Sequence, residues 1–200
     1  MKPPFLALIA LALCLAAPIE VAAQGAAPPA DLLALPRCVW NKLRIDARAP
    51  LLSAIEARDA AAIDRATAAI RANTLQSAVA CSPSINQDQP TGDEVLLSGL
   101  RQEAAGDLIN RDLKLSKAQL DRAIATAPAP LTAALRKIAN QKANRLQPDP
   151  TPSLSPIFTA LKLPAAGPAN AVQAAWLTSY VLGYHEVRAY AAYYNPNPKE

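Results

Sequence analysis

The chain has 200 residues, of which 52% are hydrophobic, with a formal net charge of +4 and a single histidine. This length allows one ordinary domain, which we predict over residues 31–200. No run of alternating β-branched and polar residues occurs, so no β-sheet is predicted. The short motifs of serine hydrolases, zinc proteases, phosphate-binding loops and haem attachment are also missing. We therefore predict no cofactor and no metal, and an enzyme is the less favoured class.

The first two dozen residues are typical of a secretory signal peptide. Lys2 gives a short positive start, residues 5–17 form an unbroken apolar run, and Pro18 ends that run. Val21-Ala22-Ala23 then supplies the positions that a signal peptidase reads, so we predict a signal peptide over residues 1–23. The apolar run is shorter than the roughly 20 residues that span a bilayer, so no transmembrane segment is expected in the mature chain. The predicted location is periplasmic or secreted, after cleavage near Ala23.

Two cysteines remain after this cleavage, because Cys14 lies in the signal peptide. In an exported chain, Cys38 and Cys81 are most simply a disulfide. A redox pair usually sits two residues apart, and a metal site needs three or four ligands. The predicted bond would join the first mature helix to the end of the following helical segment.

Prolines and capping residues mark the predicted helices of the first half. Residues 24–30 are predicted to be a disordered leader, and Pro36 is expected to open a helix over residues 36–46. Pro50 opens the next helical piece, which Asp59 divides by capping a fresh start. Residues 82–90 form a predicted loop rich in Ser, Asn, Gln and Pro.

The second half carries the clearest helix starts. Thr91-Gly92-Asp93-Glu94 and Ser116-Lys117-Ala118-Gln119 each fit a capping box, and Pro130 begins a further helix. Residues 147–156 hold four prolines. This density excludes helix and favours an extended strap, so these residues are predicted as an internal linker.

The last helix-sized segment, residues 171–194, holds Trp176 and all five tyrosines of the chain. Seven residues follow one stripe of an α-helix: Val172, Trp176, Tyr180, Gly183, Val187, Ala191 and Tyr194. We expect the other helices to assemble around this one, with Gly183 as a point of close approach. The predicted fold is all-α: an irregular helical bundle of about five to seven helices, with the Pro-rich strap before the C-terminal aromatic helix.

The aromatic residues of this helix are the candidate binding residues: Trp176, Tyr180, Tyr184, Tyr190, Tyr193 and Tyr194. They span more than one face, and tyrosine is enriched at interfaces. Because Tyr190, Tyr193 and Tyr194 crowd one end, at least one of them should be exposed. An ordinary core helix is the alternative, whereas seating on a membrane is disfavoured because the polar face is not strongly basic.

Positive charge gathers ahead of the strap. Residues 111–145 hold eight Lys or Arg against two Asp, a local net charge of +6. Four of these residues define a candidate basic face: Arg136, Lys137, Lys142 and Arg145. Such a face could dock lipid headgroups, cell-wall polymers or an acidic partner, or it could simply be solvated. Aromatic residues do not alternate with these charges, so nucleic acid is not expected.

The single histidine, His185, invites a catalytic role beside Glu186, with Asp93 as a third scattered residue. Adjacent residues on a helix point about 100° apart, so His185 and Glu186 do not form a dyad by side-chain contact. We expect a histidine at the border of the packed stripe, hydrogen-bonded locally or solvated.

These observations favour a non-enzymatic exported binding protein that works through its Tyr-rich C-terminal helix. Its partner would be an unknown protein or envelope component, with a homo-oligomer as a further option. Two alternatives stay open: a hydrolase-type envelope enzyme with a site of scattered residues, and a structural envelope protein that docks polyanions through the basic face. A pocket of convergent, pKa-perturbed groups would favour the enzyme, and an aromatic patch would favour binding.

Overall fold

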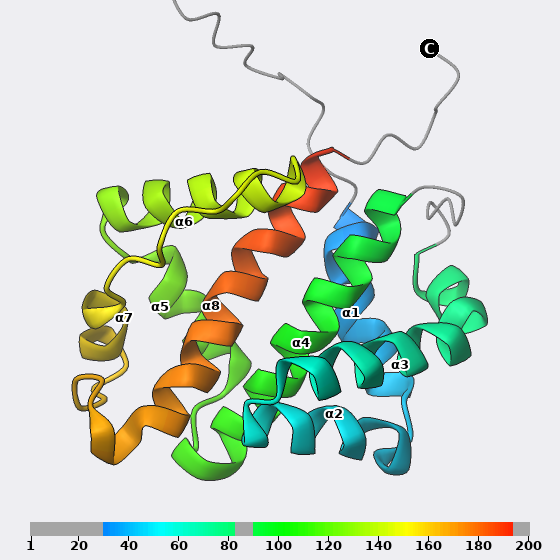
Figure 1. Ribbon diagram of the computed structural model, residues 1–200, viewed down its shortest axis with the longest axis horizontal. Helices are drawn as coiled ribbons and strands as arrows, with labels where there is room; N and C mark the ends of the chain where they lie inside the picture. Colours follow the sequence, from blue (N-terminus) through cyan, green and yellow to red (C-terminus); the bar gives the residue numbers. More distant parts are fainter. Residues whose placement is uncertain (1–29, 83–89, 194–200) are drawn as a thin grey trace, which may run out of the picture.

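The computed structural model describes residues 30–82 and 90–193, and within these ranges the chain is all-helical without strands (Figure 1). The predicted all-α class is confirmed. The described ranges hold eight α-helices and one short 3-10 helix: α1 (Ala30–Lys42), α2 (Ile45–Ala57), α3 (Ala60–Cys81), α4 (Pro90–Leu113), α5 (Lys117–Ala125), α6 (Ala129–Ala143), α7 (Ser155–Ala160), η1 (Pro168–Asn170) and α8 (Ala171–Ala192).

Several predictions fall outside the described ranges. These are the signal peptide over residues 1–23, the leader as far as residue 29, the loop over residues 83–89, and Tyr194. At the borders of these segments, Ala30 begins α1, Ser82 follows the last residue of α3, and Pro90 begins α4.

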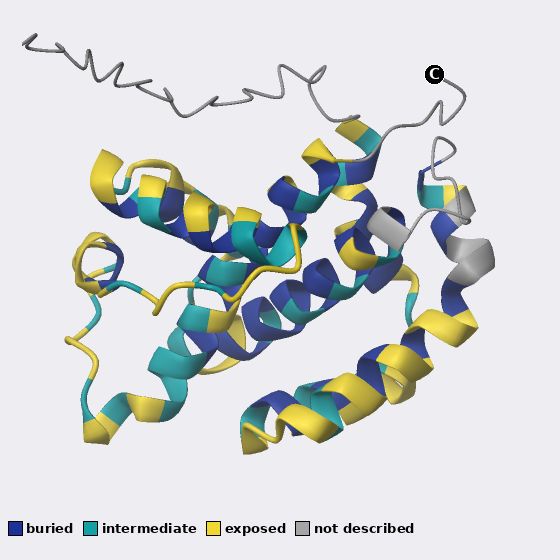
Figure 2. Cartoon of the chain, turned by 45° about the horizontal axis from the view of Figure 1, so that its top comes forward, coloured by how far each residue is buried: buried dark blue, intermediate teal, exposed yellow. Residues whose placement is uncertain are grey.

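Two long helices, α4 and α8, form the centre of the bundle. Helix α8 lies against α4 and α6, and α4 also contacts α1, α2 and α3. The expectation that the helices assemble around α8 alone is therefore corrected, because α4 buries an apolar face of similar extent. The α4 face comprises Val95, Leu96, Leu100, Ala104, Ala105, Leu108 and Ile109, and the α8 face comprises Trp176, Leu177, Tyr180, Val181, Val187 and Ala191. Figure 2 shows buried residues gathered on the inner faces of the helices and exposed residues on the outer ones.

Glycines permit the close approach of α4 and α8. A Cβ atom added at Gly183 would lie 2.8 Å from Cβ of Gln102 and 3.3 Å from the carbonyl oxygen of Ser98. One added at Gly106 would lie 2.8 Å from the ring of Tyr180. The predicted role of Gly183 as a contact point between helices is confirmed.

The predicted caps at Asp59 and Ser116 are confirmed, whereas the side chain of Thr91 lies outside the described residues and α4 begins at Pro90. Asp59 accepts the backbone N–H of Ala62 at 3.0 Å and starts α3, and Ser116 forms the full capping box with Gln119. The predicted roles of Pro36 and Pro50 are wrong, because both lie inside helices, α1 and α2. The ring of Pro36 occupies the space that a side chain would need at Gly99 of α4, so tertiary packing holds α1 together there.

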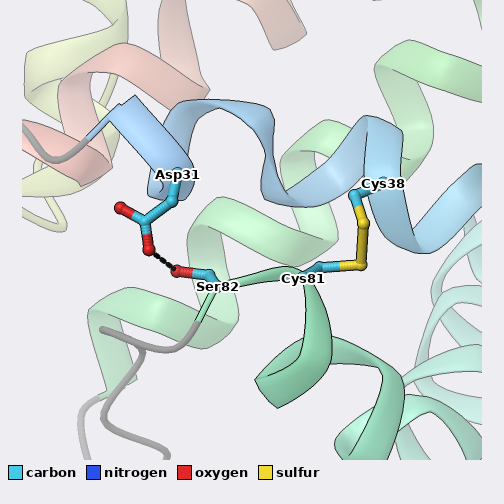
Figure 3. The surroundings of a disulfide bond; sticks show 4 residues. All are labelled: Asp31, Cys38, Cys81 and Ser82. Atoms are coloured by element: carbon cyan, nitrogen blue, oxygen red, sulfur yellow. Dashed lines mark hydrogen bonds between the residues drawn. A yellow bond between two sulfur atoms is a disulfide. The ribbon is translucent and has the colours of Figure 1, made fainter.

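The predicted disulfide between Cys38 and Cys81 is present, with an S–S distance of 2.07 Å and Cα atoms 5.8 Å apart (Figure 3). It joins the middle of α1 to the last residue of α3. Next to it, the hydroxyl of Ser82 donates to the carboxylate of Asp31 at 2.6 Å. The first and third helices are thus fastened together covalently, as expected.

The Pro-rich strap runs back along α6 toward α7 (Figure 1). Residues 146–154 contain no helix, and Ser155 and Pro156 already belong to α7, two residues earlier than the predicted end of the linker. The amide N–H of Asp149 donates to the side chain of Gln141 at 2.9 Å. Leu154 is buried at the far end, so the strap is fixed at both of its ends.

Candidate functional site

The aromatic residues of α8 divide into a buried set and a surface set. Trp176 and Tyr180 are buried in the core, with exposed fractions of 2% and 0%. Tyr184 and Tyr190 are half-buried, and Tyr193 is 48% exposed. The expectation that at least one tyrosine at the end of the helix is exposed is confirmed. Trp176 and Tyr180 thus stabilise the monomer, and the accessible aromatic surface lies toward the C-terminal end.

Buried Tyr180 belongs to a network of charged residues between α1, α4, α5 and α8. Its hydroxyl donates to Asp121 at 2.8 Å, and burial, followed by the charge of Asp121, raises the pKa of this phenol. The nearby Glu103 pairs with Arg37 at 3.1 Å and with Lys117 at 2.7 Å. The network thus joins four helices through its ion pairs and the hydrogen bond of Tyr180. Because its charges are paired, it leaves little free charge for catalysis.

The network borders a hollow of about 170 Å³, and Tyr184 is one of the residues that line this hollow. Arg188 lies over the Tyr184 ring, with Cζ 3.4 Å from the ring centroid, and Arg37 lines the same hollow. A cation this close to an aromatic face is a favourable contact. The Tyr184 ring is therefore covered on one side by its own helix.

The end of α8 and the end of α6 together form what we call the Tyr193 patch: Asn144, Arg145, Leu146 and Tyr193. The side chain of Asn144 donates to the hydroxyl of Tyr193 at 2.8 Å. Leu146 is 60% exposed, and Arg145 between them is exposed as well. Three large hydrophobic side chains are exposed in the described part of the chain, and this patch holds two of them. The third, Ile45, begins α2.

The predicted basic face is partly neutralised. Lys137 pairs with Asp149 of the strap at 2.8 Å, and Lys142 pairs with the buried Glu186 at 2.5 Å. Arg136 and Arg145 are exposed. The charge that α6 offers to a polyanion is therefore lower than its sequence indicates.

His185 is buried, with an exposed fraction of 5%, so the expectation of a border histidine that is solvated or hydrogen-bonded locally is wrong. Its Nε2 has no hydrogen-bond partner among the described residues. Burial, and then the positive charges of Arg188 and Arg136, lower the pKa of His185 to about 4. Such an imidazole is neutral at pH 7 and too weakly basic for efficient general-base catalysis there.

The scattered residues of the enzyme alternative make separate contacts. Asp93 forms an ion pair with Arg71 of α3, whereas the carboxylate of Glu186 contacts Lys142 of α6 and, at 3.2 Å, the hydroxyl of Ser98. No contact described for these residues joins Asp93, His185 and Glu186. The described part of the chain also holds no cluster of metal-ligating residues.

A second hollow, of about 160 Å³, surrounds Glu186 and is called here the Glu186 hollow. Its lining comes from α2, α3, α4, α6 and α8: Ile55, Ile63, Ser98, Arg101, Lys142, Ser179, Leu182, Gly183 and Glu186. By contrast, the hollow under the strap, about 490 Å³, is lined by uncharged residues such as Leu154, Phe158 and Thr178. The Glu186 hollow combines apolar walls with a few polar groups, which is typical of small-molecule sites.

Comparisons with protein-family models, with curated proteins and with solved structures find no match to this chain. Function must therefore be argued from the geometry alone.

Sequence reasoning missed the polar residues that α4 contributes, Ser98, Arg101 and Glu103. One signal was available for Glu103, which lies three residues after Leu100 and directly before Ala104. A charged residue among apolar positions at helical spacing requires a buried partner. The partners of Glu103 are Arg37 and Lys117. Both belong to other helices, so the sequence alone cannot pair them with Glu103.

Proposed function

We propose that the protein is an exported binding protein that docks a protein partner with the Tyr193 patch. The observation that carries this proposal is the exposure of Tyr193 and Leu146 on neighbouring helix ends linked by a hydrogen bond. Tyrosine and arginine are enriched at the energetic centres of interfaces. A fixed ring also loses little conformational entropy on binding, which favours affinity.

The chemistry of the patch points to an apolar pocket with an acidic rim on the partner. Arg145 supplies positive charge beside the two apolar side chains, and the chain as a whole carries a net charge of +4. The disulfide between Cys38 and Cys81 supports an oxidising compartment such as the periplasm. Among the described residues no helix is both long and apolar enough to cross a membrane.

The proposal is tested by placing a photo-crosslinking phenylalanine analogue at Tyr193 in the producing cell. We expect a defined adduct, and we expect Leu146→Ser to weaken it at least tenfold with an unchanged melting temperature. The same analogue at Ile45, which is 74% exposed on α2, is the matched control and should give no such adduct.

The mass of the adduct identifies the partner class. An adduct with twice the mass of the chain would assign the patch to a homo-oligomer, which light scattering would then detect. Equal crosslinking from positions 193 and 45, or none from either, would overturn the proposal.

A further inference from the structure

The Glu186 hollow has one apolar side and one polar side. Ile55, Ile63 and Leu182 supply the apolar side. A cavity of about 150 Å³ is known to hold a molecule of the size of benzene, and this hollow has a similar volume, about 160 Å³. Its ligand would therefore have a small apolar body.

The negative charge inside the hollow is already satisfied. One oxygen of Glu186 lies 2.5 Å from Nζ of Lys142, and the other accepts the hydroxyl of Ser98 at 3.2 Å. Glu186 is 7% exposed, so its carboxylate is largely shielded from water, whereas the Lys142 side chain is 39% exposed. A ligand cation would have to compete with Lys142 for this carboxylate.

The positive charge of the hollow is not fully satisfied. Arg101 pairs with Asp64 through Nη2 at 2.8 Å, and Asp64 is 71% exposed. Nε of Arg101 is buried and has no hydrogen-bond partner in the described part of the chain. A buried donor without an acceptor costs free energy. The side chain of Arg101 lines the hollow and is 39% exposed, so a ligand in the hollow can reach its guanidinium group. The charged lining residues, Arg101, Lys142 and Glu186, also sum to one positive charge.

We propose that the Glu186 hollow binds a small monocarboxylate whose carboxylate is held by Arg101 and whose apolar body packs against Ile55, Ile63 and Leu182. Arginine matches the geometry of a carboxylate, which favours an acid over a neutral alcohol of the same size. This site lies between α2, α3, α4, α6 and α8, and it does not depend on the Tyr193 patch.

Benzoate is the probe, because it joins a benzene-sized body to a carboxylate. Isothermal titration of the mature protein at pH 7 should show one saturable site, and benzyl alcohol, the neutral probe of similar size, should bind at least tenfold more weakly. Arg101→Gln should weaken benzoate binding at least tenfold, because it removes a charged hydrogen bond. Arg65→Gln, which removes the same charge from an exposed position on α3, should leave binding unchanged.

A second variant separates binding from folding. Ser179 is exposed at the hollow, so Ser179→Phe should fill the entrance without disturbing the core. We expect it to abolish benzoate binding with an unchanged circular dichroism spectrum and melting temperature. No binding of benzoate by the wild-type protein, equal binding of benzyl alcohol, or full affinity in a folded Arg101→Gln protein would each overturn the proposal.

Discussion

Gly183 lets the backbones of α8 and α4 lie against each other. The nearest atoms that a new side chain would meet are Cβ of Gln102 and the backbone of Ser98, which belong to the middle of a long helix and have little room to move. Glycine in a helix costs about 1 kcal/mol relative to alanine, so its presence here reflects packing.

The first prediction follows from this contact. Gly183→Leu should lower the free energy of unfolding by about 1–3 kcal/mol, because the added side chain overpacks the crossing of the two helices. Gly167→Leu is the control, since a Cβ there meets only the carbonyl oxygen of Ala165, at 3.9 Å. Urea denaturation measures both variants, and equal stabilities would show that the helices can separate at low cost.

His185 should make stability depend on pH. Its pKa in the folded protein is about 4, below the usual 6.5, so unfolding takes up a proton between these values. The stabilisation is present in full above about pH 6.5 and is lost as the pH falls toward 4, by at most about 3 kcal/mol.

The measurement is thermal melting from pH 7.5 down to 4.5. The wild-type protein should lose stability over this range, and His185→Phe should lose less, because that ring cannot be protonated. His185 is the only histidine of the chain, so no second imidazole complicates the comparison. Parallel curves for the two proteins would contradict the assignment.

At the scale of the helices, capping residues predicted where helices begin more reliably than prolines did. Asp59 and Ser116 were identified from their own short motifs, because a cap is made within four residues. Pro36 and Pro50 misled the same reasoning, since what stabilises a helix around a proline is contact with other helices. For α1 the ring of Pro36 contacts α4 at Gly99, where the missing side chain leaves room for it. Gly99 lies more than 60 residues further along the sequence.

The disulfide between α1 and α3 belongs to the same scale. Its half-cystines are 43 residues apart, for which the chain-entropy model gives a stabilisation of at most about 4 kcal/mol. Replacing Cys38 and Cys81 by serine should therefore lower the midpoint of guanidinium unfolding, and added reductant should no longer change it. The intact mass of exported protein, before and after reduction and alkylation, checks the bond and the predicted start near Gln24 together. Two free thiols in unreduced protein would contradict the bond.

At the scale of the whole molecule, the sequence predicts the class of fold and the buried stripe of α8, because both depend on helical periodicity. The candidate sites could not be predicted as completely. Lys142 was assigned to a solvated basic face but pairs with Glu186, which lies 44 residues further along the chain. Pairings of this kind depend on how α6 crosses α8, and no local pattern contains that geometry.

The late position of α8 in the chain has a consequence for biosynthesis. The apolar face of α4 that contacts this helix lies within residues 90–113, yet α8 begins only at residue 171 and follows the Pro-rich strap. The apolar face of α4 therefore stays uncovered by α8 while residues 114–170 are being made. The core between α4 and α8 can therefore form only after α8 itself has been made. A product that ends before residue 171 would lack α8 and leave the apolar face of α4 exposed.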